Sequence, residues 1–373
     1  MDTGFQKRGQ LVEIHIADLH FGAFDPRTQF KILEEQFLNE IITLPRIDLI
    51  SILGDTFDHK MMANSDGVLM SIQFVDRLVQ IAKRYNATLV ILAGTLSHDS
   101  NQLKLFYHYL EDTELDIRIV TTIQFEYIKG ARVLCIPELY GIDEEVYQKF
   151  FNWGPYDMAI CHCTFKGAVY GDNAGNGRLF TIEDFKLCMG PILSGHVHNA
   201  GCFNTYFYYC GCPYRWKFGE EEDKGFMIVL HDLDTHYFIN QFMKIESFRY
   251  DTVYIDELVS TDPKAIIDYI NNLKVTQNID FIKIRFRVPV VGGSKAIISN
   301  YYRNSNNTFV EFLDVAEEQK KKMEGNSGID ERFAFILDDK LSDLEKFIMY
   351  VNECEQDQFI TVDQLKELLE EDI

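Results

Sequence analysis

Short apolar runs rich in β-branched residues alternate with amphipathic helical patterns through the first two thirds of the chain. The runs at residues 11–16, 49–53 and 88–92 are typical of strands that are covered on both faces. The segments between them, at about residues 26–41 and 66–84, place apolar side chains at helical spacing. This alternation of strand and helix predicts a layered α/β fold.

Further strands are expected at residues 133–136, 158–161 and 192–194, and after about residue 250 the pattern changes. Alternation at 282–290 predicts another strand, with a turn at Gly292-Gly293 after it and a polar loop at 304–308. Two capping-box patterns then predict a pair of terminal helices. We therefore expect three domains, at residues 1–245, 250–308 and 309–373.

Histidine, aspartate and glycine gather where the predicted strands end. The motifs are Asp18-x-His20, Gly54-Asp55-x-x-Asp58-His59, Gly94-x-x-Ser97-His98-Asp99, Cys161-His162-Cys163 and Gly195-His196-x-His198. Because the carboxyl ends of parallel strands meet at one edge, we expect these side chains to form one cluster.

The mixture of imidazole and carboxylate groups predicts a metal centre. Such donors suit manganese, iron or zinc better than magnesium or calcium. The donors outnumber what one ion takes, which favours two ions that share a carboxylate and act on phosphoesters. Each motif alone also fits a turn or a cap, but the joint set favours the metal site. The paired cysteines flank only one residue, a poor spacing for structural zinc, and are expected to be core thiols.

The same motifs, in this order, resemble the calcineurin-like metallophosphoesterase superfamily. A later stretch, Gly211-Cys-Pro-Tyr-Arg-Trp-Lys-Phe-Gly-Glu-Glu-Glu-Asp-Lys-Gly-Phe226, resembles the corresponding segment of SbcD-type nucleases, a group that includes recombination endonuclease subunits of large bacteriophages. The resemblance implies a layered metallophosphoesterase fold, a β-sandwich flanked by helices. It also implies a small α+β capping domain and a helical C-terminal tail.

The resemblance further implies the role of each motif residue. One ion would be held by Asp18, His20 and His198. The second would be held by His162 and His196, with Asp55 bridging both. His98 would face the scissile phosphate as a catalytic residue. Two divalent ions, with manganese expected, would support DNA exonuclease or endonuclease activity in recombination, repair and replication.

One motif departs from the family pattern, which has Gly-Asn-His-Asp where this chain has six residues ending in His98-Asp99. Aligned on His98, Ser97 replaces the asparagine ligand of the second ion. Ser97 is therefore expected as a metal ligand, with Thr95 or a water as the alternatives. His59 is expected either to assist catalysis or to be an ordinary surface histidine.

The charge distribution narrows the expected partners. The chain has 58 acidic and 36 basic residues, a net charge of −22, which excludes nucleic-acid binding by bulk charge. The stretch 281–303 has five basic and no acidic residues, so it either helps a capping domain to position DNA or forms the solvated face of a small sheet. Residues 341–373 are strongly acidic, and their helices either dock on a coiled-coil ATPase of the SbcC type, as the resemblance implies, or pack on their own domain.

The resemblance also allows a homodimer. No apolar run is long enough to span a bilayer, and the first residues lack the apolar core of a signal peptide, so we expect no membrane association. A cytoplasmic location, in a bacterium or a phage-infected host, is expected. Two other functions stay open: a phosphatase or cyclic-nucleotide phosphodiesterase of the same superfamily, and a scaffold whose metal site has decayed through the Ser97 change.

Overall fold

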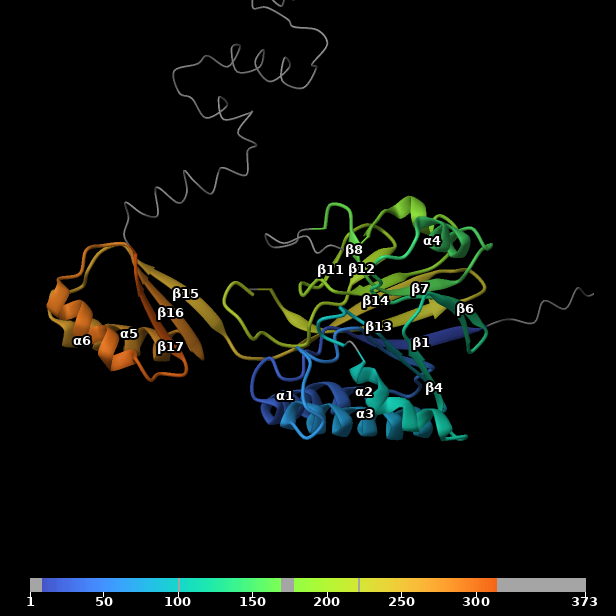
Figure 1. The fold of residues 1–373 in the computed structure, drawn as a ribbon, viewed down its shortest axis with the longest axis horizontal. Coiled ribbons are helices and arrows are strands. Elements are labelled where there is room, and N and C mark those ends of the chain that lie inside the picture. The colour runs from blue at the N-terminus through green and yellow to red at the C-terminus, as the bar shows by residue number, and fades with distance from the viewer. Residues whose placement is uncertain (1–8, 100, 169–177, 221, 314–373) are drawn as a thin grey trace, which may run out of the picture. The chain divides into compact units, whose positions relative to one another are not determined.

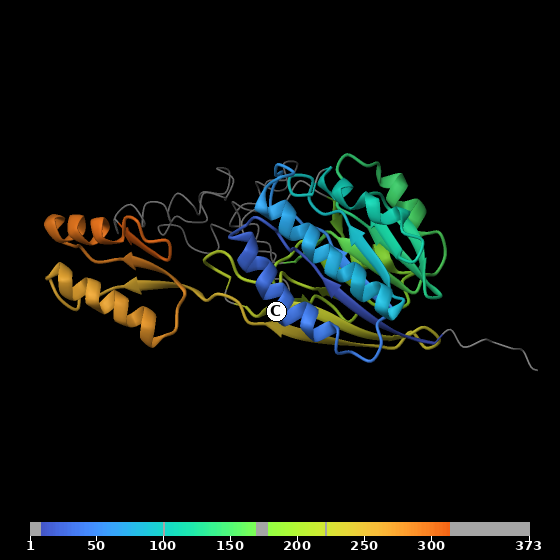
Figure 2. The same cartoon turned by 90° about the horizontal axis from the view of Figure 1, so that it is seen from below.

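The computed structural model describes residues 9–99, 101–168, 178–220 and 222–313. Figures 1 and 2 show its ribbon in two views. Contacts divide the described residues into two compact units. The large unit runs to Asp251 and includes Asn278–Phe281, while the small unit comprises Thr252–Gln277 and the described residues from Ile282 onward. The predicted mixed α/β character is confirmed.

Two six-stranded sheets form the centre of the large unit. The first has the order β14 (Phe238–Ile245), β13 (Lys224–Asp232), β1 (Gln10–Ile16), β2 (Leu49–Leu53), β3 (Thr88–Leu92) and β4 (Asp116–Val120). The second has the order β11 (Gly201–Cys202), β12 (Phe207–Tyr209), β10 (Ile192–Gly195), β7 (Met158–His162), β6 (Ala131–Ile136) and β5 (Gln124–Ile128). The six strands predicted in this part of the sequence are all confirmed.

The neighbours from β1 to β4 run parallel, and so do those from β6 through β7 and β10 to β12. A separate parallel pair consists of β8 (Thr164–Phe165) and β9 (Leu179–Phe180). Since the central strands of each sheet point the same way, the loops that follow them lie at a common edge.

The two helical segments predicted in the large unit are confirmed, and the structure adds three helices that were not predicted, at residues 102–111, 144–151 and 182–185. In chain order the helices are α1 (Pro26–Leu33), a π-helix (Glu34–Leu38), α2 (Asn39–Ile41), α3 (Asp66–Tyr85), a 3-10 helix (Gln102–Glu111), α4 (Glu144–Phe151) and a second 3-10 helix (Ile182–Phe185). The side chain of Asp25 caps α1, which has Pro26 in its first turn. The Ser65 side chain caps α3, and Asn86 ends that helix in the left-handed conformation.

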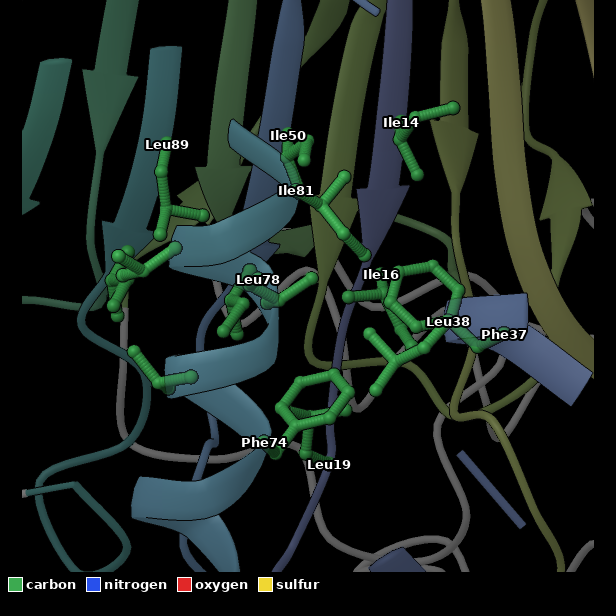
Figure 3. Close-up of a cluster of buried hydrophobic side chains, with 14 of the residues drawn as sticks. Ile14, Ile16, Leu19, Phe37, Leu38, Ile50, Phe74, Leu78, Ile81 and Leu89 are labelled. Carbon is green, nitrogen blue, oxygen red and sulfur yellow. The ribbon is translucent and has the colours of Figure 1, made fainter. Parts of the chain in front are cut away.

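Apolar side chains on α3 pack against one face of the first sheet. Figure 3 shows Phe74, Leu78 and Ile81 of the helix beside Ile14 and Ile50 of the strands. In Figure 2, α1 and α3 lie next to each other on this face. Burial of these side chains stabilises the helices by roughly 1.5–3 kcal/mol for each large apolar group.

The strand residues that alternate with these face the second sheet. Leu49, Leu53 and Val90 pack with Val133 and Ile160 in a core that contains residues of both sheets. A third core joins the other face of the second sheet to α4 and the second 3-10 helix. The large unit therefore has four layers, with a helical layer outside each of the two sheets.

The small unit contains a three-stranded sheet and two helices. Its elements are β15 (Tyr250–Ile255) from Thr252 onward, α5 (Pro263–Thr276), β16 (Phe281–Phe286) from Ile282 onward, α6 (Gly292–Tyr302) and β17 (Thr308–Phe312). Alternation along β16 is confirmed, because Ile282, Ile284 and Phe286 are buried while Lys283 and Arg285 are partly exposed.

Three predictions for this region are wrong in detail. The strand expected at 282–290 ends at Phe286. The Gly292-Gly293 turn is instead the first turn of α6. The predicted boundary at 308/309 falls at the start of β17, which pairs with β16, so residues 308–312 belong to the small unit. The rest of the predicted helical tail, residues 314–373, lies outside the described residues.

Every cysteine within the described ranges is a free thiol, and Cys161, Cys163, Cys210 and Cys212 are buried as predicted. Across these ranges, no helix combines the length and apolar character needed to cross a bilayer.

Candidate metal centre

Loops after β1, β2 and β3 in the first sheet meet those after β6, β7 and β10 in the second. Hydrogen bonds join the sheets here. Among them, the ring Nδ1 of His162 bonds to the Leu53 carbonyl at 2.7 Å, and the Glu138 backbone N–H donates to the Ala93 carbonyl at 3.3 Å. Nearly all of the predicted site residues lie in these loops, as expected from the parallel strand order.

The first group of potential ligands consists of Asp18, His20 and His198, whose donor atoms lie within 4.8 Å of one another. Asp18 is fully buried, and its two carboxylate oxygens accept the backbone N–H of His196 at 2.9 and 3.1 Å. The rings of His20 and His198 lie 5.1 Å apart between centroids. This group contains the three residues that the resemblance assigns to one ion.

Three residues of the nuclease-like segment (residues 211–226) contact His198 or His20. The Glu220 carboxylate lies 3.2 Å from Nδ1 of His198, which leaves Nε2 as the nitrogen available to a metal. The Lys224 ammonium group donates to the His198 carbonyl at 3.0 Å. The Trp216 ring lies 4.9 Å from the His20 ring and 4.8 Å from the His198 ring. The segment thus fixes the orientation of two potential ligands.

The second group consists of Asp55, His162 and His196. Nε2 of His162 lies 3.3 Å from Oδ2 of Asp55 and 3.2 Å from Nδ1 of His196. The same Asp55 oxygen lies 3.7 Å from Nε2 of His20 in the first group. Asp55 therefore has a histidine of each group within 4 Å of one oxygen, as a bridging ligand requires.

Four of these residues have a left-handed backbone. The φ angle is +52° at Asp18, +43° at His20, +49° at Asp55 and +84° at His196. This region costs roughly 1–2 kcal/mol for a residue other than glycine. Such conformations persist where the surrounding structure imposes them, and they cluster at functional sites.

Two glycines allow the loops to approach this closely. Gly54 has φ +85°, and a Cβ there would lie 2.2 Å from Nδ1 of His162. A Cβ on Gly94 would lie 2.2 Å from the amide nitrogen and Oδ1 of Asp55. Any side chain at either position would displace a potential ligand.

Glu138, two residues beyond β6, was not predicted to belong to the site. Its Oε2 lies 3.3 Å from Nδ1 of His196 and 3.7 Å from Nε2 of His162. The Thr95 hydroxyl lies 2.8 Å from the same oxygen and 3.1 Å from Oδ2 of Asp55. Ser97 is exposed, so its predicted ligand role gains no support, and Thr95 is the residue of this loop beside Asp55.

The candidate catalytic residue His98 lies beside the first group. Its ring is perpendicular to that of His20, with centroids 4.7 Å apart, and its Nδ1 bonds to the Asp58 carbonyl. The Asp58 carboxylate lies 3.5 Å from Nδ1 of His20 and 3.0 Å from Nδ1 of His59. The His59 side chain is 58% exposed, on the outer side of Asp58, which is the position of a surface histidine.

Burial and mutual attraction perturb the pKa values of these groups. Burial raises the pKa of Asp18 to about 6, with a smaller contribution from Asp55 and opposition from His162 and His20. Burial alone would also raise the pKa of Asp55, but the adjacent imidazoles, His162 first, hold it well below its usual range. Burial disfavours the charged form of His162, yet Asp55 raises its pKa well above the ordinary value. Without metal, His162 and Asp55 therefore form an ion pair.

Each of the two groups could hold a metal ion, and their mixed imidazole and carboxylate donors have the chemistry that the sequence predicted. Neither ring nitrogen of buried His20 makes a hydrogen bond within the described part of the chain, although both face carboxylates at 3.5–3.7 Å. A buried imidazole without such a partner is costly, and a cation between it and the carboxylates would satisfy both.

Comparisons with known proteins do not identify a family. No family model matches the chain, and no curated protein does. One solved crystal structure is 12% identical, with a TM-score of 0.40 over 63% of this chain and 100% of its own. A protein of unknown function from Aquifex aeolicus is 17% identical, with a TM-score of 0.21 over 44% of this chain and 82% of its own. Similarities this weak carry no argument about fold or function.

Proposed function

We propose that the protein is a two-metal-dependent DNA nuclease of the SbcD type, within the calcineurin-like metallophosphoesterase superfamily. The observation that carries the proposal is the position of Asp55, with one oxygen near His20 of the first group and His162 of the second. A shared carboxylate between two sets of imidazole ligands is typical of centres that hydrolyse phosphoesters. The four layers of the large unit are compatible with the metallophosphoesterase layering.

The residues divide between two ions as the resemblance implies. Asp18, His20 and His198 would hold the first, His162 and His196 the second, and Asp55 both. When bound, such ions polarise phosphoryl oxygens and lower the pKa of water. The chain supplies the rigid frame that sets the positions of these ligands, through the loops described above.

His98 is the proposed catalytic residue that faces the phosphate. Because its Nδ1–H donates to the Asp58 carbonyl, Nε2 is the nitrogen free to contact substrate. Nε2 carries a proton only in the imidazolium form, and that form can stabilise phosphate charge or protonate the leaving oxygen.

The choice of DNA rather than a small phosphoester rests on the nuclease-like segment. Its Trp216 and Glu220 contact ligand histidines, so the part of the chain that carries the resemblance belongs to the centre. The activity would serve recombination, repair and replication, as in the SbcD-type complexes.

Stable capture of DNA is assigned to a coiled-coil ATPase partner of the SbcC type. The basic strand of the small unit is partly neutralised within that unit, since Arg285 lies 2.7 Å and Lys283 3.8 Å from Glu311, and Arg287 lies 3.6 Å from Asp256. DNA affinity of the isolated chain is therefore weak. The acidic segment proposed to bind the partner lies outside the described residues.

The proposal is tested with the purified full chain on end-labelled duplex DNA in manganese, magnesium or zinc. We expect manganese-dependent release of nucleotides, abolished by EDTA. His98→Gln should lower kcat by about 10²–10⁴-fold while both ions still bind. The matched control is His108→Gln, at an exposed histidine. Absence of DNA hydrolysis in every metal contradicts the proposal, and turnover of small phosphoesters without action on DNA favours the phosphatase alternative.

A further inference from the structure

Glu138 brings a second carboxylate to the histidines of the second group. Oε2 lies 3.3 Å from Nδ1 of His196 and 3.7 Å from Nε2 of His162, and the side chain is only 8% exposed. Its other contacts are with hydroxyl groups: Thr95 at Oε2 and Tyr140 at Oε1. These hydroxyls are neutral, so the positive charge that a buried carboxylate requires must come from the imidazoles or from an ion.

The backbone explains why this carboxylate reaches the centre. Glu138 follows the last residue of β6, Ile136, by two positions. Asp18 follows the end of β1 by two positions, and Asp55 follows the end of β2 by two. The backbone N–H of Glu138 also donates to the Ala93 carbonyl, beside Gly94 and Thr95. Glu138 is thus placed by the same arrangement of strand ends as the predicted aspartate ligands.

We infer that Glu138 is a direct ligand of the second ion, together with Asp55, His162 and His196. The inference rests on the proposed two-metal function and assigns to this chain a ligand outside its recognisable motifs. Asp18, the shared Asp55 and Glu138 would together offset three of the four positive charges of two divalent ions, against two without Glu138. Carboxylate oxygen is also a stronger donor for manganese than a serine or threonine hydroxyl. The second site therefore has a full set of ligands without Ser97, and the altered motif does not imply a decayed centre.

Thr95 acts as a positioning residue in this arrangement. Its backbone N–H donates to Oδ1 of Asp55 at 2.6 Å, while its hydroxyl lies within hydrogen-bond distance of both Asp55 and Glu138. One residue thereby holds the two carboxylates of the second site beside each other. The hydroxyl has one proton, so it donates to one carboxylate at a time, and an ion between the carboxylates would offset their repulsion.

The test is manganese binding by the full chain, measured by calorimetric titration and by electron paramagnetic resonance. The wild-type chain should bind two ions and give the spectrum of a spin-coupled pair. Glu138→Gln retains the size and the acceptor oxygen for Thr95 but removes the charge. It should lower the affinity for the second ion by at least about tenfold and leave the affinity for the first ion unchanged. At intermediate manganese concentrations, it should give the six-line spectrum of an isolated ion. The matched control is Glu145→Gln, at an exposed glutamate of α4.

The outcomes separate this inference from the proposed function. If the wild-type chain binds two ions and cleaves DNA, but Glu138→Gln binds both with unchanged affinity, Glu138 is not a ligand and the nuclease proposal stands. An equal loss of affinity for both ions in Glu138→Gln also overturns the inference. If the wild-type chain never binds a second ion, the two-metal function itself is wrong. Should Glu138→Gln fail to fold, Glu138→Asp provides the same measurement with the charge retained and the reach shortened, and unchanged binding of the second ion contradicts the inference.

Discussion

The two ligand groups of the centre are built differently. In the first, Asp18 is the group's own carboxylate, and outer residues of one segment hold the histidines, with Glu220 on His198 and Trp216 against both rings. In the second, His162 is held by a backbone carbonyl of the opposite sheet. Glu138 is an extra carboxylate there. The first group thus depends on a neighbouring segment for orientation, and the second depends on the junction of the two sheets.

Substitution of Asp55 should impair metal binding by both ligand groups. Asp55→Asn retains the shape of the side chain but removes the shared charge. The affinity for both ions should therefore fall, and kcat should fall by at least about 10²–10³-fold. Metal content by mass spectrometry and the nuclease assay measure the two effects. An exposed aspartate of α5, Asp268→Asn, is the control. Full activity with two retained ions would show that Asp55 does not bridge.

Asp18→Asn should abolish binding of the first ion and leave binding of the second ion unchanged. We expect one manganese ion per chain at concentrations that saturate both sites of the wild type, because the second group does not contain Asp18. This is the opposite of the result expected for Glu138→Gln. Loss of both ions in the Asp18 variant would show that the two sites are filled as one unit.

Glu220→Gln should lower the affinity for the first ion by about tenfold and leave the affinity for the second unchanged. Groups that orient metal-binding histidines commonly contribute about this factor to metal affinity. Two-site titration measures both affinities in one experiment. The exposed neighbour Glu222→Gln is a control within the same segment. An equal effect of the two substitutions would argue that Glu220 acts through general charge and not through His198.

The response to pH should also differ between the groups. The pKa of Asp18 is raised to about 6, so below pH 6 a proton occupies the carboxylate and competes with the first ion. Its affinity should fall by about tenfold between pH 7 and pH 5. The pKa of His162 is raised well above its ordinary value, so the second ion should displace a proton even at pH 7. Titration in buffers of different ionisation enthalpy counts these protons, and equal release for both ions would contradict the assignment.

The smallest effects concern the altered motif. Thr95→Val removes the hydroxyl that lies between Asp55 and Glu138. The affinity for the second ion should fall by a few fold, because the loss of one hydrogen bond costs about 1 kcal/mol. Ser97→Ala should leave both affinities within experimental error, because Ser97 is exposed. The reverse order of these effects would restore Ser97 as the ligand.

Much of the fold and most of the candidate site could be predicted because local patterns encode both. Short β-branched apolar runs predicted the central strands, and helical apolar patterns predicted the helices on the first sheet. Five motifs at strand ends predicted the candidate ligands. Glu138 was missed because Pro137-Glu138 has no glycine or histidine beside it to signal a site. A rule was nevertheless present in the sequence: the acidic residue lies two positions after a predicted strand, as do Asp18 and Asp55.

Predictions failed where packing between distant segments decides the structure. Two glycines favour a turn, yet α6 begins at Gly292 because Ile298 and Tyr302 are buried, with the Tyr302 hydroxyl 3.0 Å from Asn271 of α5. The position of Thr95 relative to Ser97 likewise depends on the Glu138 carboxylate, contributed by another sheet. Single-sequence reasoning has no access to either partner.

The left-handed backbone at Asp18, His20, Asp55 and His196 has a consequence for the order of folding and metal binding. The packing around the loops imposes these conformations and directs the candidate ligands toward one another. Little conformational entropy remains to be lost on binding, unlike in small zinc domains that fold only around their metal. Chelation should therefore leave a folded chain that can be reloaded with a different ion, so the metal in the centre would reflect the ions available to the folded protein.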